Sequence, residues 1–85
     1  MVAASDSRLK TNVKLLFKSR SGINVYSFSY IDDPSTLYQG VMAQELIGTP
    51  FDSAVIRGER YFSVDYSQID VAFKKITALS SEERQ

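Results

Sequence analysis

The chain has 85 residues, enough for one small domain, because a chain this short cannot build two independent cores. Apolar residues make up 44% of it, which is typical of a globular and not a disordered protein. Ten basic and ten acidic residues give a formal net charge of zero. The chain therefore lacks the basic excess that would indicate nucleic acid or an anionic membrane as a partner. No apolar run is long enough to span a bilayer, and the Met-Val-Ala-Ala start lacks the features of a signal peptide. We therefore expect a soluble domain.

Cysteine and histidine are both absent. Their absence excludes disulfides, zinc sites built from Cys or His, thiol nucleophiles and Ser-His-Asp triads. A hydrolytic site in this chain must take its nucleophile from Ser, Thr or a carboxylate, and its base from Lys, Tyr or a carboxylate. We expect no cofactor and no metal.

The first half of the chain predicts a β-hairpin. Residues 1–8 are small and polar and indicate a turn or an incoming linker. Apolar residues alternate through 9–17 and again through 23–31, where Tyr26, Phe28 and Tyr30 fall on one strand face. The Ser19-Arg20-Ser21-Gly22 turn signal between these two segments favours an antiparallel pairing.

The second half begins with a chain break at Asp32-Asp33-Pro34-Ser35, where Asp and Pro favour a turn. Residues 38–46 start strand-like and become helix-compatible after Gly40, which predicts a short helix near 42–47. After a loop at Gly48, Pro50 and Asp52, residues 54–57 and 60–66 predict a second hairpin.

A C-terminal helix is expected after this hairpin. Ser67 and Asp70 form an S-x-x-D start signal. Apolar residues then recur at three-and-four spacing, which is typical of an amphipathic helix: Ile69, Ala72, Phe73, Ile76 and Leu79. The sequence thus predicts an α+β fold with two antiparallel hairpins, a short central helix and a C-terminal amphipathic helix. Residues 1–4 are interpreted as a linker or the remnant of a trimmed longer chain, 5–79 as the domain and 80–85 as a polar tail.

One segment, Ser5-Asp6-Ser7-Arg8-Leu9-Lys10, offers chemistry without histidine. A lysine can act as base for a serine nucleophile once desolvation lowers its pKa towards neutrality. A turn followed by a strand allows Lys10 to fold back towards Ser5, but the local pattern alone favours a solvated turn beside two surface cations.

Other candidate sites have a plainer interpretation. Asp32 and Asp33 are an acidic pair for a cation, but no EF-hand pattern follows them. Glu45 and Asp65 are candidate glycosidase carboxylates, but nothing in the sequence fixes the distance between them that this chemistry requires. The Tyr and Phe rows suit either base or sugar stacking or a half-buried core face, and the lack of basic interleaving favours the core.

Three segments together resemble the endosialidase-type intramolecular chaperone auto-processing domain. They are S-D-S-R-L-K at 5–10 followed by Thr11-Asn12-Val13, G-V-M-A-Q-E-L at 40–46, and F-S-V-D-Y-S at 62–67. They occur in the family's order, and the resemblance covers roughly 5–77. Such domains lie at the C-terminus of homotrimeric phage tail spikes and fibres, assist their folding and release themselves by autoproteolysis.

The resemblance implies specific roles. The cut would fall between Ala4 and Ser5, with Ser5 as nucleophile and Lys10 as general base. Asp6, Arg8, Gln44 and Asp65 lie at motif positions, and we interpret them as structural supports. For Gln44 and Asp65 a buried hydrogen bond and a helix-entry cap are the favoured explanations.

The expected partners are further copies of the chain, as a homotrimer, and an upstream spike or fibre stalk. The expected location is the host cytoplasm during phage assembly, or the virion tail if the domain is not released. The chain departs from longer members, which carry an extra helix before the Tyr-rich strand and a longer trailing helix. Only Met1 to Ala4 precede the cut, so the chain is either trimmed from a longer protein or a stand-alone virion component that does not cleave. The same motif pattern would also fit the self-processing domain of a membrane-tethered transcription factor.

Overall fold

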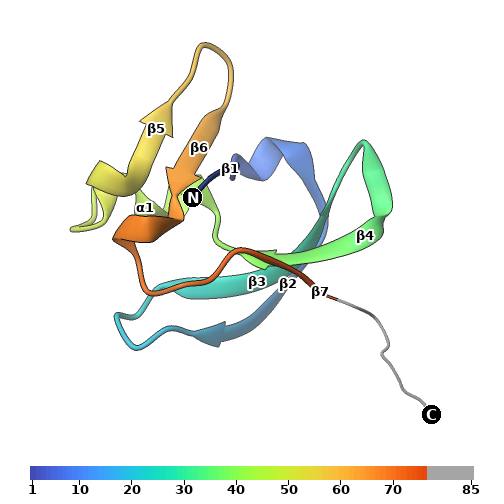
Figure 1. Cartoon of the computed structure of the whole chain (residues 1–85), viewed down its shortest axis with the longest axis horizontal. Helices are drawn as coiled ribbons and strands as arrows, with labels where there is room; N and C mark the ends of the chain where they lie inside the picture. The colour runs from blue at the N-terminus through green and yellow to red at the C-terminus, as the bar shows by residue number, and fades with distance from the viewer. Residues whose placement is uncertain (77–85) are drawn as a thin grey trace.

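The computed structural model describes residues 1–76, which form a mostly β fold with two antiparallel sheets (Figure 1). The larger sheet has the order β2-β3-β4-β7, with strands β2 (Lys10–Lys18), β3 (Asn24–Tyr30), β4 (Asp33–Gly40) and β7 (Lys74–Ile76). The smaller sheet has the order β1-β6-β5, with strands β1 (Val2–Ala4), β6 (Phe62–Asp65) and β5 (Val55–Arg57). A four-residue helix, α1 (Ala43–Leu46), and the 3-10 turns η1 (Ser7–Leu9), η2 (Asp52–Ala54) and η3 (Tyr66–Gln68) connect the strands.

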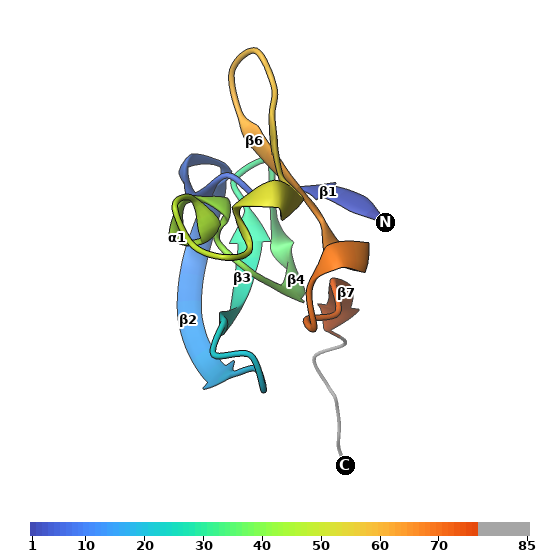
Figure 2. The same ribbon diagram turned by 90° about the vertical axis from the view of Figure 1, so that its left-hand side faces the viewer.

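Both hairpins predicted from the sequence are present. Strand β2 pairs with β3, and β5 pairs with β6. The tip of the β5–β6 hairpin projects away from the larger sheet (Figure 2). The helix expected near 42–47 is α1. Three further strands, β1, β4 and β7, complete the sheets. Strand β1, where a turn or linker was expected, pairs with β6, and β4 pairs with β3 although it contains Pro34. Pro34 lies at the second residue of β4, near the strand start, where its missing N–H is tolerated.

The α+β assignment is wrong, because residues 69–76 do not form the predicted amphipathic helix. Asp65, and not Ser67, caps the turn η3, and its carboxylate accepts the Ser67 N–H. The Asp70 carboxylate accepts the Ser21 N–H instead of starting a helix. Strand β7 then pairs with β4, so pairing along a sheet edge outcompetes the three-and-four pattern of the sequence. Leu79 and the predicted tail 80–85 lie outside the described residues.

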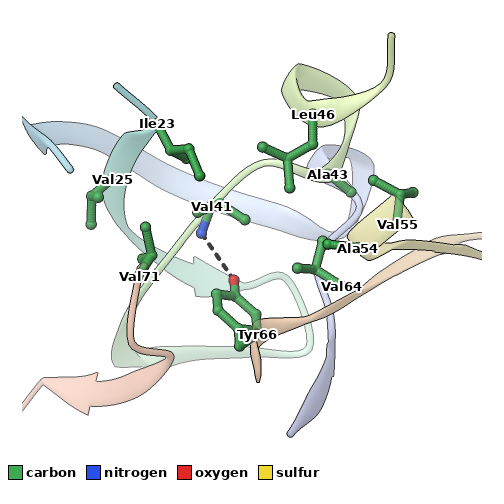
Figure 3. Close-up of a cluster of buried hydrophobic side chains, with 10 residues drawn as sticks. All are labelled: Ile23, Val25, Val41, Ala43, Leu46, Ala54, Val55, Val64, Tyr66 and Val71. Atoms are coloured by element: carbon green, nitrogen blue, oxygen red, sulfur yellow. Dashed lines mark hydrogen bonds between the residues drawn. The ribbon is translucent and has the colours of Figure 1, made fainter. Parts of the chain in front are cut away.

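The hydrophobic core joins the two sheets and α1 (Figure 3). Its buried members are Ile23, Val25, Val41, Ala43, Leu46, Ala54, Val55, Val64, Tyr66 and Val71. Tyr66 brings a hydroxyl into this core, and its Oη accepts the Val41 N–H at 2.9 Å. The core therefore carries a polar group directly beside the segment that leads into α1. No helix in residues 1–76 is long and apolar enough to cross a membrane.

A second packed group consists of the aromatic side chains on β3, β4, η3 and the segment before β7. The ring pairs are Phe28–Tyr30, Phe28–Tyr38, Tyr30–Tyr38, Tyr38–Phe73 and Tyr66–Phe73, with centroids 5.2 to 6.3 Å apart. Because the rings pack against one another and Phe28 is fully buried, the structure favours the core interpretation of this row over a stacking platform.

Candidate active site

Ser5 and Lys10 lie together in the interior. The backbone of Ser5 is fixed from two sides, because its N–H donates to the Phe62 carbonyl and its carbonyl accepts the Ala43 N–H. The turn η1 then reverses the chain, so that Lys10 at the start of β2 points back at Ser5. Lys10 Nζ donates to the carbonyl oxygens of Ser5 at 3.0 Å and Val41 at 2.6 Å. Ser5 is 0% exposed and Lys10 only 7%, so the solvated-turn interpretation is wrong.

Burial changes the chemistry of the Lys10 amine. Desolvation lowers the pKa of Lys10 to about 7, and the negative charge of Asp6 opposes this shift without cancelling it. The Phe28 ring covers Nζ at 4.2 Å from its centroid. A neutral amine has two N–H groups, which match the two carbonyls, and one lone pair. Near neutral pH Lys10 is therefore able to accept a proton.

The hydroxyl of Ser5 lies 2.9 Å from Tyr66 Oη, which itself accepts the Val41 N–H. Gly40 makes this arrangement possible, because a Cβ at that position would lie 2.5 Å from Tyr66 Oη. Within residues 1–76, the Ser5 hydroxyl hydrogen-bonds to the Tyr66 hydroxyl, whereas Lys10 Nζ donates to the carbonyl oxygen of Ser5. Catalytic hydrogen bonds are often long or misaligned in resting structures, so proton transfer from Oγ requires Nζ to move from the carbonyl oxygen towards the hydroxyl.

The peptide bond between Ala4 and Ser5 is held at both ends. It is trans, so its N–H and its C=O point in opposite directions. The N–H of Ser5 donates to Phe62 on β6, and the Ala4 carbonyl, facing away from β6, accepts a hydrogen bond from the Tyr30 hydroxyl. The bond that the sequence resemblance marks for cleavage thus lies in a defined position.

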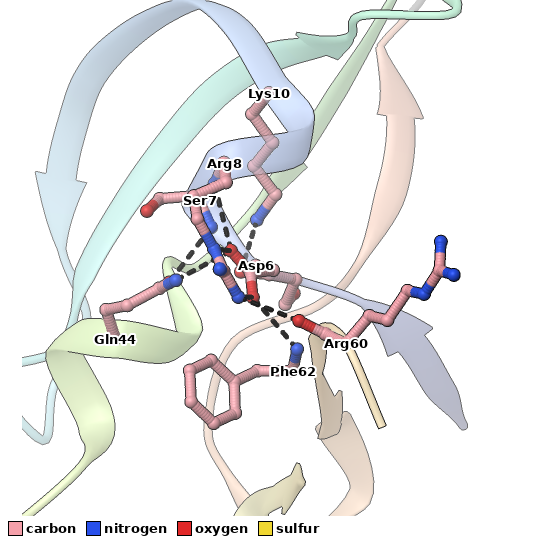
Figure 4. A network of polar contacts seen from close by, with 8 residues as sticks. Asp6, Ser7, Arg8, Lys10, Gln44, Arg60 and Phe62 are labelled. Atoms are coloured by element: carbon pink, nitrogen blue, oxygen red, sulfur yellow. Dashed lines mark hydrogen bonds and ion pairs between the residues drawn. The ribbon is translucent and has the colours of Figure 1, made fainter. Parts of the chain in front are cut away.

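Asp6 is the centre of a polar network that stabilises this turn (Figure 4). Its fully buried carboxylate accepts hydrogen bonds from the Arg8 backbone and guanidinium, the Gln44 side chain and the Phe62 N–H. The Arg8 side chain contributes most to holding the pKa of Asp6 far below its usual range. Gln44 Oε1 in turn accepts the Ser7 N–H. The network joins η1, α1 and β6, so it fixes the backbone that follows Ser5.

Replacing Asp6 by asparagine is expected to destabilise the fold by about 3 kcal/mol at neutral pH, because several buried or half-buried N–H donors lose a charged acceptor. The folded pKa of Asp6 lies below the unfolded value near 3.8, so its contribution is present above that pH and is lost as the pH falls below it. Urea unfolding of wild type and Asp6→Asn between pH 3 and 7 measures this. Asp32→Asn, at an exposed aspartate, is the control. An equal change in both variants would contradict the structural role of Asp6.

The candidate glycosidase carboxylates, Asp65 and Glu45, have separate partners. Asp65 accepts hydrogen bonds from Ser67 and Gln68 as the cap of η3, and Glu45 accepts from Tyr26 and Asn24. In the described part of the chain no three Asp or Glu side chains lie close enough to hold a metal ion. Asp65 therefore acts as a cap and Glu45 as a hydrogen-bond acceptor.

Two tyrosines at the site, Tyr30 and Tyr66, were not predicted from the sequence. Tyr66 lies within the F-S-V-D-Y-S motif, which was the only available signal for it. Tyr30 was assigned to an alternating strand face, and its hydroxyl reaches Ala4 only because β1 and β3 come together in the fold.

Comparison with protein families adds independent evidence. The model of the family described as chaperone of endosialidase matches residues 5–56, more than half of the chain. The chain belongs to the chaperone-of-endosialidase family. The match contains Ser5, Lys10 and Gln44 and ends before the F-S-V-D-Y-S segment. Comparisons with curated proteins and with solved structures gave no match. Membership of this family supports a chaperone role associated with phage tails.

Proposed function

We propose that this domain is an intramolecular chaperone that trimerises, assists the folding of an upstream phage tail spike or fibre, and releases itself by cutting between Ala4 and Ser5. The observation that carries the cleavage is the buried Lys10 amine, with a pKa of about 7, held 3.0 Å from the carbonyl oxygen of Ser5. Ser5 is the nucleophile and Lys10 the general base. The reaction takes place in the host cytoplasm during assembly.

The first step is an acyl transfer within the chain. Ser5 Oγ forms a bond to the Ala4 carbonyl carbon while Lys10 Nζ accepts the hydroxyl proton. The carbon–nitrogen bond then breaks, and Lys10 returns the proton to the leaving Ser5 nitrogen. The product is an ester between the Ala4 carboxyl group and the Ser5 hydroxyl, with a free amino group on Ser5.

The second step is hydrolysis of this ester. Lys10 accepts a proton from a water molecule, whose oxygen bonds to the ester carbon, and the proton passes to Ser5 Oγ as the carbon–oxygen bond breaks. One water molecule is consumed, and the chain is divided into a fragment ending at Ala4 and a domain beginning at Ser5. Ala4 is exposed, which supports access of water to this bond.

Self-association is supported by the surface of β2. This strand lies at the edge of the larger sheet, and four of its apolar side chains are 41 to 54% exposed: Val13, Leu15, Leu16 and Phe17. A long apolar edge strand is a ready surface for pairing or packing with another chain. Further copies of the same domain would bury it and bring three upstream ends together.

Light scattering is expected to give three times the mass of one chain, and Leu15→Lys combined with Phe17→Lys to lower that mass to a monomer. Lys14→Ser, on the same strand, changes an exposed polar side chain and serves as the control. A wild-type monomer at high concentration would contradict the trimer.

Trimerisation and cleavage both serve the folding of the upstream stalk. Stalks built from intermolecular contacts must find their register before those contacts stabilise them. A trimerising module raises the effective concentration of the upstream segments. Its removal afterwards leaves a kinetically trapped product.

The proposal is tested with a passenger protein fused before Met1. Gel electrophoresis and mass spectrometry are expected to show a passenger fragment ending at Ala4 and a domain beginning at Ser5. A fusion that stays full length while correctly folded would contradict autoproteolysis and favour the alternative, a non-cleaving virion component.

A further inference from the structure

The Ala4 carbonyl is the group on which negative charge develops when Ser5 Oγ attacks. Its oxygen accepts a hydrogen bond from one side chain, the Tyr30 hydroxyl. The smaller sheet does not use this oxygen, because the N–H of the same trans peptide is the group that faces β6 and bonds to Phe62. Tyr30 therefore reaches the reacting carbonyl from the side opposite β6.

We propose that Tyr30 is a catalytic residue of the cleavage, donating its hydroxyl hydrogen bond to the Ala4 oxygen as that oxygen becomes an oxyanion; this inference rests on the proposed function. A donor already in place where charge develops stabilises the transition state more than the ground state. The hydrogen bond polarises the Ala4 carbonyl in both steps, because the same oxygen carries the charge during acyl transfer and during ester hydrolysis.

The surroundings of Tyr30 suit this role. Its ring packs edge-on against Phe28 at 5.4 Å and Tyr38 at 5.2 Å between centroids, so the aromatic cluster fixes its direction. Burial raises the pKa of Tyr30 to about 12, and the hydroxyl keeps its proton over the range in which Lys10 is neutral. Tyr30 thus remains a donor while Lys10 acts as the base.

One other donor near Ala4, the Arg8 guanidinium, is already engaged. The Arg8 guanidinium donates to both Asp6 oxygens and to the Arg60 carbonyl. An open hollow of about 550 Å³ borders Ala4 and Tyr30, with Arg8, Ile31 and Tyr61 among its other lining residues. Water for the second step has a route to the Ala4 carbon along this hollow, on the Tyr30 side of the peptide.

Tyr30→Phe tests the inference, because it removes the hydroxyl and keeps the ring. Cleavage of the passenger fusion is followed by pulse-labelled cell-free translation, so that the rate is measured from synthesis onward. We expect the rate to fall roughly 100-fold, as for loss of one oxyanion donor. The thermal unfolding midpoint and the pH dependence, which Lys10 sets, are expected to stay close to those of the wild type.

Tyr26→Phe is the matched control, because Tyr26 lies on the same strand and its hydroxyl bonds to Glu45, away from Ala4. Its cleavage rate should equal that of the wild type. A Tyr30→Phe fusion that cleaves at the wild-type rate, or a rate loss matched by Tyr26→Phe or by a lowered unfolding midpoint, would overturn the role of Tyr30 and leave the proposed function standing. A folded wild-type fusion that never cleaves would overturn both.

Discussion

Ser5→Ala is expected to abolish cleavage of the passenger fusion, with a rate reduced by roughly 10⁴-fold or more, because it removes the hydroxyl that forms the ester. The fold should survive, since the substitution removes one hydroxyl that bonds to Tyr66 and costs about 1 kcal/mol. The measurement is the fraction of full-length fusion on a gel over time, together with the thermal unfolding midpoint.

Ser29→Ala is the matched control for this substitution. Ser29 is as fully buried as Ser5, and its hydroxyl donates to the Pro34 carbonyl on the neighbouring strand. The two variants should therefore lose similar stability, while only Ser5→Ala stops cleavage. Continued cleavage of Ser5→Ala at the same bond would show that Ser5 is not the nucleophile.

Lys10→Met is expected to reduce cleavage by a comparable factor, because it removes the base and keeps an apolar side chain of similar length. In the wild type the rate should rise with pH and reach half of its plateau near pH 7, since only the neutral amine accepts the Ser5 proton. Cleavage of the fusion between pH 5 and 9 gives this profile. Lys14→Met, at an exposed lysine on the same strand, is the control.

A pH-independent rate, or cleavage by Lys10→Met at the wild-type rate, would contradict the base assignment. Stability provides a second measurement on uncleaved Ser5→Ala chains. The folded pKa of Lys10 lies below its unfolded value of 10.5, so the unfolded chain binds the extra proton between about pH 7 and 10.5. The free energy of unfolding should therefore rise with pH in this window, by roughly 4 kcal/mol between pH 7 and 10. Lys10→Met should lack that rise.

The sequence predicted the local elements that depend on neighbouring residues. Alternation through 23–31 and the turn at Gly22 define the β2–β3 hairpin, and the change of pattern after Gly40 defines α1. The C-terminal segment was predicted wrongly, because its three-and-four spacing competes with the open edge of β4. That edge exists only after the larger sheet has formed, so no local pattern reveals it.

The candidate site, like the fold, was predicted only in part from the sequence. The absence of Cys and His leaves several nucleophiles and bases open, Ser with Lys among them, and the resemblance selects Ser5 and Lys10. The contacts of Tyr30 and Tyr66 are long-range, from β3 to Ala4 and from η3 to Ser5 and Val41, and sequence spacing carries no information about them. The burial that lowers the pKa of Lys10 likewise comes from the assembled fold, because the Phe28 ring and the Ser5 and Val41 carbonyls surround its amine on a strand whose other side chains are half-buried or exposed.

Trapping of the ester tests the central claim most directly. The passenger fusion is synthesised in the presence of hydroxylamine, which attacks an ester far faster than a peptide bond, and the passenger fragment is analysed by mass spectrometry. Ester formation on Ser5 predicts a fragment that ends in the hydroxamate of Ala4, formed by the wild type and not by Ser5→Ala. A wild-type fragment that ends only in the free Ala4 carboxylate at high hydroxylamine, or a cut at any other bond, would contradict it.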